Sequence, residues 1–324
     1  MNQSVDVSDS VERGLLARIG LAFLGFLVPG LGLAMAGKIR LGLIFASVSF
    51  GGLILLFAYY SFGPEISFNA LVVILLLGGT IFLVCQIGSS VLTFFASRYV
   101  AANRTVWSRW FMAPVYLIAA FGLNELVVVN MQSQYRAFYM PSVSMSPTLH
   151  ANDRIFAKMA DFQPIERGDV VLLRANGVEY VKRIVGLPGD TVGMTNGRLM
   201  LNGEIVPAAT VKDSGTVDFC DYPANSSATN RTMIFYERLP GNGPSYPVVD
   251  CDQSVGDEFA DIRVPTGYYF LMGDNRDRSA DSRMAPPLGL GMVNRPNIVG
   301  KPLFIHWSDS REKIGRRLNT EIPQ

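Results

Sequence analysis

Hydrophobic residues are concentrated in the N-terminal part of the chain, where they form long runs without charge. Glu65 is the only charged residue between positions 40 and 98, and Glu125 is the only one between positions 109 and 136. A helix needs about 20 apolar residues to cross a hydrocarbon core about 30 Å thick. We therefore predict a helical membrane domain over residues 15–131, after a polar tail at 1–14. Its spans, about four in number, are expected near residues 15–36, 41–60, 70–96 and 111–130.

Buried helices of a soluble protein and a cleavable signal peptide both account less well for these runs. Helices buried in a soluble protein rarely continue past about 20 residues without a charge. A cleavable signal peptide begins with a basic segment, whereas the first 14 residues contain Asp6, Asp9 and Glu12.

The distribution of basic residues predicts the orientation of the spans. Short loops that carry Lys and Arg tend to stay in the cytoplasm. The segment 62–69 has no basic residue and is expected to lie outside, as is everything after about residue 131. Two cytoplasmic turns are marked by Lys38 and Arg40 and by Arg98, Arg104 and Arg109.

The first expected span can be placed in two ways. Arg13 and Arg18 flank its N-terminal end, and the sequence Pro29-Gly30-Leu31-Gly32 interrupts it. It either crosses the membrane, with the N-terminus outside, or forms a re-entrant hairpin with the N-terminus inside.

From about residue 136 onward the pattern changes to short apolar or alternating runs separated by Gly, Pro, Asn and Asp. This pattern is typical of β-structure, so we predict a mostly-β extracytoplasmic domain. Its core is expected at 136–201 and 265–310, with a loop-rich β subdomain inserted at 202–264 and a tail at 311–324. The expected strands include 153–157, 169–174, 179–185, 198–201 and 268–272.

The cysteines, the histidines and the net charge bear on whether the chain has a disulfide, a metal site or a nucleic-acid partner. Cys85 lies in an expected span, whereas Cys220 and Cys251 lie in the external domain and suggest a disulfide. With only two histidines in the chain, a metal site is a poor alternative. A net charge of +1 gives no reason to expect nucleic acid as a partner.

A serine nucleophile needs a base, and histidine is scarce. His150 follows a turn and His306 lies in the apolar run Phe304-Ile305-His306-Trp307, so neither is placed like a catalytic base. The remaining base is a neutral lysine. The ordinary lysine pKa is near 10.4, and burial lowers it by up to about 3–5 pH units, because the charged form loses its hydration.

Lys182 is the candidate base. On an extended strand it shares a face with Tyr180 and Ile184, while Arg183 lies on the opposite face with Glu179. Lysine is almost never fully buried without a reason. Taken alone, an edge-strand or snorkelling lysine explains the pattern equally well.

The candidate nucleophile lies about ten residues after the last expected span. Pro141 and Pro147 are expected to keep this segment extended and out of helix, so that Ser142 and Ser144 project to the same side. One serine could attack while the other, with a backbone N–H, stabilises the oxyanion. A polar linker would explain the serines but not the alternating Met and Leu.

These segments resemble the type I signal peptidases, the bacterial leader peptidase family, over nearly all of residues 136–307. Four blocks carry the resemblance, in the family's order. They are Pro-Ser-Val-Ser-Met-Ser-Pro-Thr-Leu (141–149), Arg-Gly-Asp-Val-Val (167–171), Tyr-Val-Lys-Arg-Ile-Val-Gly-Leu-Pro-Gly-Asp (180–190) and Gly-Asp-Asn-Arg-Asp-Arg-Ser-Ala-Asp-Ser-Arg (273–283).

The resemblance implies a role for each matched position. Ser144 would be the nucleophile and Lys182 the general base, with Ser142 and the Ser144 backbone N–H as oxyanion-hole donors. Ser279 would orient the lysine. Asp281 and Arg283 would form a supporting ion pair. Met145 and Met272 would each either line the substrate pocket or belong to the core.

The resemblance also implies an activity. We expect a multi-pass, monomeric serine endopeptidase of the bacterial plasma membrane, without metal or organic cofactor, whose partners are the lipid bilayer and secretory pre-proteins with Ala-x-Ala-like sites. Two alternatives remain for comparison. A catalytically silent scaffold would lack Ser144 or Lys182, and both are present; a self-cleaving repressor-like Ser-Lys protease would be a soluble chain.

Overall fold

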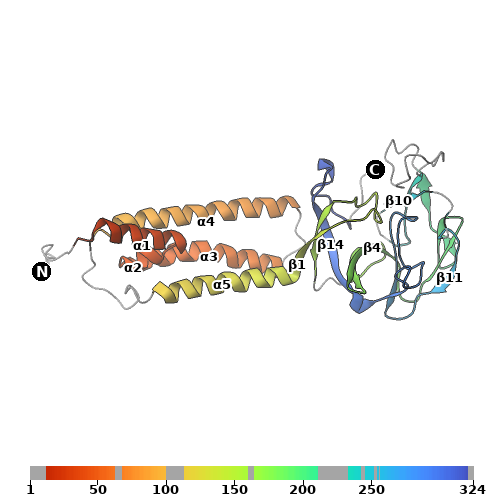
Figure 1. The fold of residues 1–324 in the computed structure, drawn as a ribbon, viewed down its shortest axis with the longest axis horizontal. Coiled ribbons are helices and arrows are strands. Elements are labelled where there is room, and N and C mark those ends of the chain that lie inside the picture. Colours follow the sequence, from red (N-terminus) through yellow and green to blue (C-terminus); the bar gives the residue numbers. More distant parts are fainter. Residues whose placement is uncertain are drawn as a thin grey trace. The chain divides into compact units, whose positions relative to one another are not determined.

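The computed structural model describes residues 12–62, 68–99, 113–159, 164–210, 233–241, 245–251, 254 and 256–319. The chain divides into two compact units, Met1–Gln132 and Ser133–Gln324. The first is built from helices and the second from strands (Figure 1). Arg104, Arg109 and Cys220 lie outside the described residues.

The helical unit contains one long apolar helix and several shorter apolar stretches. Among the described residues, α4 alone is long and apolar enough to cross a membrane. The apolar stretches Leu15–Leu27, Ile39–Gly52 and Ala113–Gly122 are shorter. One spanning helix is thus supported, and a four-span arrangement is not established. The helices are α1 (Leu15–Leu27), α2 (Leu31–Met35), α3 (Ile39–Phe62), α4 (Phe68–Ala96) and α5 (Ala113–Gln134).

Residues 15–36 do not form one continuous helix. The α1 helix ends at Leu27, and Gly30 takes a left-handed conformation with φ of 88°. The chain then turns back, because a Cβ on Gly32 in α2 would lie 2.3 Å from the Leu21 carbonyl oxygen of α1. Glycine is therefore required at both positions, one for its φ and one for close packing. Of the two placements expected for the first span, this geometry matches the hairpin.

The hairpin packs along the C-terminal turns of α4. The Arg18 side chain donates to the Phe94 carbonyl oxygen at 3.2 Å, and the Gly30 backbone N–H donates to Ser89 Oγ at 2.8 Å. From Arg98 to Ser89 is nine residues, or about 14 Å along a helix. These contacts, with the Arg13 backbone N–H bond to the Arg98 carbonyl oxygen, place α1 antiparallel to the C-terminal part of α4.

The second unit is mostly β, which confirms the predicted class of this domain. A seven-stranded sheet has the order β1-β2-β14-β3-β4-β12-β13; a three-stranded sheet has the order β10-β9-β8 and a four-stranded sheet the order β11-β5-β6-β7. The strands are β1 (Tyr135–Tyr139), β2 (Arg154–Lys158), β3 (Val170–Ala175), β4 (Val178–Gly186), β5 (Thr191–Thr195), β6 (Arg198–Leu201), β7 (Glu204–Ile205), β8 (Ala208–Thr210), β9 (Met233–Glu237), β10 (Tyr246–Asp250), β11 (Phe259–Arg263), β12 (Tyr268–Met272), β13 (Val293–Asn294) and β14 (Ile298–Trp307).

Three hairpins in this unit turn on Asn-Gly pairs. In the β3–β4 hairpin, Asn176 and Gly177 have φ of 51° and 78°, and Ala175 pairs with Val178. The pairs at 196–197 and 202–203 also have positive φ values and join β5 to β6 and β6 to β7. Two-residue turns with positive φ at both positions match the right-handed twist of the strands. The first of these turns fixes the pairing register of β4, the strand that carries Lys182.

The C-terminal segment differs from the expected separate tail. The Gly315 backbone N–H donates to the Ile305 carbonyl oxygen at 2.7 Å, and Leu318 is buried in the core cluster that contains Met145 and Leu149. A short 3-10 helix (Arg311–Lys313) precedes this contact. Residues up to 319 therefore belong to the packed unit, because their apolar side chains complete its core.

Candidate active site

Ser144 lies in a compact turn at residues 144–148 rather than in an extended segment as predicted. The Ser146 backbone N–H donates to the Val143 carbonyl oxygen, and the Leu149 N–H donates to the Met145 carbonyl oxygen at 2.8 Å. Met145 and Leu149 are fully buried in one core cluster and hold the turn in place. Local hydrogen bonds between turn residues and this anchoring outweigh the tendency of proline to extend the chain.

Lys182 lies on β4 with its side chain 2% exposed. Its Nζ donates to Ser144 Oγ at 2.7 Å, and Ser144 itself is 8% exposed. Burial lowers the pKa of Lys182 from 10.5 to about 8, because the ammonium form loses its hydration, while the nearby Asp281 carboxylate opposes this effect. About a tenth of this lysine is thus neutral at pH 7, far more than for a lysine with the ordinary pKa, and a general base needs this neutral form.

Ser142 approaches the same serine from the N-terminal side. Its Oγ lies 3.2 Å from Ser144 Oγ, and Ser142 itself is exposed. The described hydrogen-bond partners of Ser144 Oγ are therefore Lys182 and Ser142. The two serines lie on the same side, as predicted, although the backbone between them is turned and not extended.

Gly273 lies where the last sequence block meets the Ser144 turn. A Cβ at this position would lie 2.3 Å from Ser279 Oγ and 2.4 Å from the Ser144 carbonyl oxygen. The Asn275 backbone N–H donates to that carbonyl at 3.2 Å. Only glycine permits this approach, which brings Ser279 beside the nucleophile's backbone. Among the described residues, the buried Ser279 Oγ has no hydrogen-bond partner.

Asp281 and Arg283 form a buried ion pair. Arg283 Nε donates to Asp281 Oδ1 at 2.9 Å, and the Gly273 backbone N–H donates to Asp281 Oδ2 at 3.0 Å. Although burial opposes ionisation, the Arg283 guanidinium and these donors hold the pKa of Asp281 below its usual value. Asp281 therefore carries a negative charge near Lys182, and the bond from the Gly273 N–H holds this carboxylate in place.

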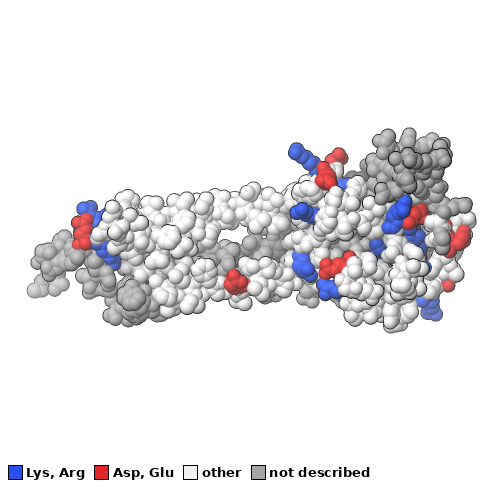
Figure 2. Space-filling model, viewed as in Figure 1, with Lys and Arg blue, Asp and Glu red and all other residues white. Residues whose placement is uncertain are grey.

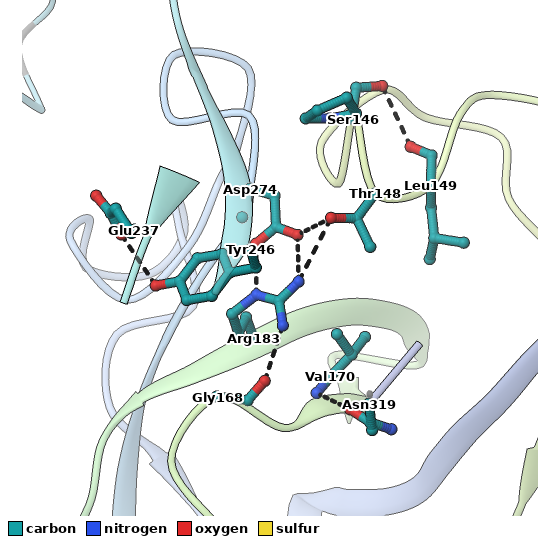
Figure 3. Close-up of polar contacts among 12 residues, drawn as sticks. Ser146, Thr148, Leu149, Gly168, Val170, Arg183, Glu237, Tyr246, Asp274 and Asn319 are labelled. Atoms are coloured by element: carbon teal, nitrogen blue, oxygen red, sulfur yellow. Dashed lines mark hydrogen bonds and ion pairs between the residues drawn. The ribbon is translucent and has the colours of Figure 1, made fainter. Parts of the chain in front are cut away.

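A second buried ion pair supports the site, and sequence reasoning missed it. Figure 3 shows the Arg183 guanidinium facing the Asp274 carboxylate, with bonds of 2.7 Å from Nε and 2.6 Å from Nη2. Thr148 Oγ1 also donates to Asp274, and Arg183 Nη1 donates to the Gly168 carbonyl oxygen. This network connects β4 next to Lys182, the Ser144 turn and the loop after β12.

Sequence reasoning gave Arg183 no role, and this omission has a physical reason. Alternation places Arg183 on the face opposite Lys182, with Glu179, but β4 is buried on both faces from Val181 to Gly186. Arg183 is 2% exposed and packs against the Tyr246 ring, whose centroid is 4.0 Å from the guanidinium carbon. A central strand covered on both sides does not show its faces by polarity. The sequence did carry one signal for Arg183. It is a second basic residue directly after Lys182, in the block that continues into Gly-Leu-Pro-Gly.

Strands from the predicted inserted segment contribute the outer part of this network. Tyr246 Oη donates to Glu237 at 2.9 Å, and Glu237 accepts two bonds from the Arg276 guanidinium, at 2.9 and 2.5 Å. Arg276, Glu237 and Tyr246 are all buried. The β9–β10 pair is therefore attached to the active-site loop and not only to the surface of the core.

Met145 and Met272 lie within the hydrophobic core. They are 0% and 1% exposed and belong to two different core clusters. Of the two interpretations open from the sequence, the structure places both methionines as core residues. It gives no support to a direct pocket-lining role for either one.

Cys251 is disulfide-bonded, Cys85 is free, and Cys220 lies outside the described residues. One group of acidic residues, Asp250, Asp257 and Asp277, could approach a single cation. Its carboxylates already serve the loop, since Asp257 accepts bonds from Ser254 and Asp277 accepts the Cys251 backbone N–H. We interpret this group as loop scaffolding.

A buried lysine 2.7 Å from a serine, with an adjacent second hydroxyl, defines the class of Ser-Lys hydrolases. The family described as signal peptidase, peptidase S26, matches residues 107–307. This match covers more than half of the chain, and the chain belongs to that family. The resemblance predicted from the four sequence blocks is thereby confirmed.

Curated relatives agree with this assignment. The chain is 35% identical over 166 residues to signal peptidase I S of Bacillus subtilis, covering 51% of this chain and 72% of the relative. It is 32% identical over 187 residues to signal peptidase I of Bacillus amyloliquefaciens, covering 56% and 81%. It is 32% identical over 217 residues to signal peptidase I of Pseudomonas aeruginosa, covering 59% and 72%.

Proposed function

We propose that this chain is a membrane-bound serine endopeptidase that removes N-terminal signal peptides from exported pre-proteins with Ala-x-Ala-like sites. The observation that carries the proposal is the 2.7 Å contact between Lys182 Nζ and Ser144 Oγ in a member of the signal peptidase family. The relatives' names support the same substrate class.

The mechanism assigns one role to each group. Neutral Lys182 accepts the Ser144 proton while Oγ attacks the scissile carbonyl carbon, and the Ser142 hydroxyl and Ser144 backbone N–H stabilise the oxyanion. The protonated lysine then donates to the leaving amine as the C–N bond breaks. Water hydrolyses the acyl-enzyme, with Lys182 again accepting a proton. The family resemblance assigns Ser279 to orienting the lysine; its buried Oγ has no partner among the described residues, so this hydroxyl is free to bond Lys182 during the reaction.

The proposed membrane topology has the N-terminus in the cytoplasm. The α1–α2 hairpin re-enters from the cytoplasmic side, and α3, α4 and α5 cross, so that the β unit lies outside. Three observations support this arrangement. The chain turns back at Gly30, directly after α1. Lys38 and Arg98 lie in loops, and Arg40 lies in the first turn of α3. Cys251 is disulfide-bonded. Disulfides persist in oxidising compartments, which include the bacterial periplasm.

Cleavage by purified full-length protein in detergent tests the proposal. The wild type should cut a pre-protein after its Ala-x-Ala site, and Ser144→Ala and Lys182→Met should be inert though folded. Ser142→Ala should lose about 10²–10³-fold in kcat, as expected for one oxyanion donor. Lys158→Met, which changes a strand lysine outside the site, is the matched control. A silent wild type would favour the scaffold interpretation, and an active Lys182→Met would reject the assigned base.

A further inference from the structure

The helical unit contains an apolar cavity of about 200 Å³ that the peptidase mechanism does not use. One wall is α3, another is α5, and the third is the turn between α1 and α2. Leu43 lines the cavity and is itself 58% exposed, so the cavity reaches the outer surface of this unit. The side chains of its two helix walls are small or apolar, apart from the phenol of Tyr116.

The cavity has the depth of one membrane leaflet. Along α3 its lining residues run from Ile39 to Phe50 on one face, with Gly42, Leu43 and Ala46 between them. Eleven residues of helix correspond to about 16 Å. This length is about half of a hydrocarbon core about 30 Å thick. The cavity therefore begins at the basic end of α3 and ends near the middle of the proposed membrane.

Two basic residues without described partners stand at its entrance. Lys38 and Arg40 flank the lining residue Ile39 and are exposed. Other basic side chains at this end are engaged, since Arg98 pairs with Glu12 at 2.9 Å and Arg18 donates to Phe94. Figure 2 shows charged side chains gathered at this end of the helical unit, while the helices beyond it are almost uncharged on the visible face.

The size of the cavity decides between two apolar occupants. A helix with its side chains is about 10–12 Å across, so a 16 Å length of helix would need more than about 1,000 Å³. The cavity is several times smaller and cannot hold a signal-peptide helix. An unbranched acyl chain is much narrower than a helix, and a volume of about 200 Å³ admits part of one.

We propose that this cavity binds one acyl chain of an anionic diacyl phospholipid from the cytoplasmic leaflet, with the phosphate of the headgroup paired with Lys38 and Arg40. The proposal rests on the membrane topology given above. Basic pockets between helices on the cytoplasmic side are suited to anionic headgroups. The hairpin, which forms one wall, would then be held in place by a lipid.

Native mass spectrometry of the full-length protein tests this site with dioleoyl phosphatidylglycerol and dioleoyl phosphatidylcholine in detergent micelles. The wild type should retain one phosphatidylglycerol. Ala46→Phe, which fills the cavity, should reduce the amount of retained phosphatidylglycerol at least tenfold. Ala17→Phe, at an exposed α1 position outside the lining, should leave this amount unchanged. If Ala46→Phe fails to fold, Ala120→Phe fills the cavity from the α5 wall.

The headgroup contact has its own variants. The double change Lys38→Gln with Arg40→Gln should reduce the preference for phosphatidylglycerol over phosphatidylcholine by about 30-fold, which corresponds to the usual contribution of two basic residues. The charge-preserving double change Lys38→Arg with Arg40→Lys should keep the preference. Equal retention of both lipids by the wild type would overturn the proposal.

Two further outcomes also reject it. One is unchanged phosphatidylglycerol binding in Ala46→Phe and Ala120→Phe. The other is displacement of the lipid by a synthetic signal peptide that crosslinks to position 46, because the occupant would then be the substrate. Native mass spectrometry measures lipid retention without any cleavage step. The pre-protein cleavage assay therefore tests the peptidase assignment independently of the lipid site.

Discussion

The charge state of Lys182 should control the rate of reaction. Because burial lowers its pKa to about 8, kcat/KM should fall about tenfold for each pH unit below that value as the base becomes protonated. The Asp281 carboxylate raises this pKa and the Arg283 guanidinium lowers it. Asp281→Asn should therefore move the acidic limb of the profile to lower pH, and Arg283→Gln should move it to higher pH.

Pre-protein cleavage measured across pH checks these opposite shifts, with circular dichroism to show that both variants are folded. A limb that stays in place while both variants keep their activity would mean that Lys182 is not the titrating base. Loss of activity with an unchanged limb would assign the ion pair a structural role only.

The buried pair Arg183–Asp274 should be important for stability because both side chains are almost fully buried. Arg183→Met leaves the Asp274 carboxylate without its cation, which typically costs about 3–5 kcal/mol. The double variant Arg183→Met with Asp274→Leu should recover part of this loss, because no uncompensated charge remains. Thermal unfolding in detergent measures all three proteins. Equal loss in the single and double variants would show that the pair's charge is not the cause.

At the scale of elements, the α1–α2 hairpin depends on close packing. A side chain on Gly32 would meet the Leu21 carbonyl oxygen and Thr93, so Gly32→Val should destabilise the helical unit by about 1–3 kcal/mol, as overpacking usually does. Gly79→Val on α4, where no neighbour lies within 4 Å, is the control. The measurement is the loss of helical circular dichroism on heating. Similar effects of the two changes would argue against the hairpin.

Most elements of the β unit were predictable because short alternating runs and turn residues are local signals. The runs at 198–201 and 268–272 coincide with β6 and β12, and the others differ from their strands by one or two residues. The hairpin in the first apolar run was less predictable, since its direction depends on contacts with α4 that lie 59 or more positions away. Hydrophobicity reports burial in lipid or protein but not where a helix turns back.

The reacting residues of the site were predictable from the sequence, whereas the buried polar residues that hold them in place were less so. Ser144 and Lys182 lie in sequence blocks with a family resemblance, and the structure brings them together. Glu237 and Tyr246 lie in a loop-rich segment without any block, so nothing in the sequence alone joins them to Arg276. Such long-range polar contacts are set by tertiary packing, which periodicity does not encode.

At the scale of the whole molecule, the proposed topology predicts which positions face outward. A single cysteine at Asn69, at the start of α4, or at Ser310 in the β unit should react with a membrane-impermeant maleimide in intact cells. A single cysteine at Gln3 should react only after the membrane is permeabilised. The background chain needs Cys85→Ala, and protein without any added cysteine corrects for the remaining thiols. Labelling of position 3 in intact cells would mean that the first segment crosses.

The Asn-Gly turns that fix the strand register also have a chemical consequence over time. An asparagine followed by glycine is easily attacked by the next backbone nitrogen, because glycine has no side chain to hinder ring closure, and asparagine is among the thermolabile residues. Asn176, Asn196 and Asn202 all stand in this context and are exposed. We expect deamidation and isoaspartate to accumulate at these three turns as the protein ages. The β3–β4 hairpin, which leads into the Lys182 strand, would then carry an altered backbone at its turn.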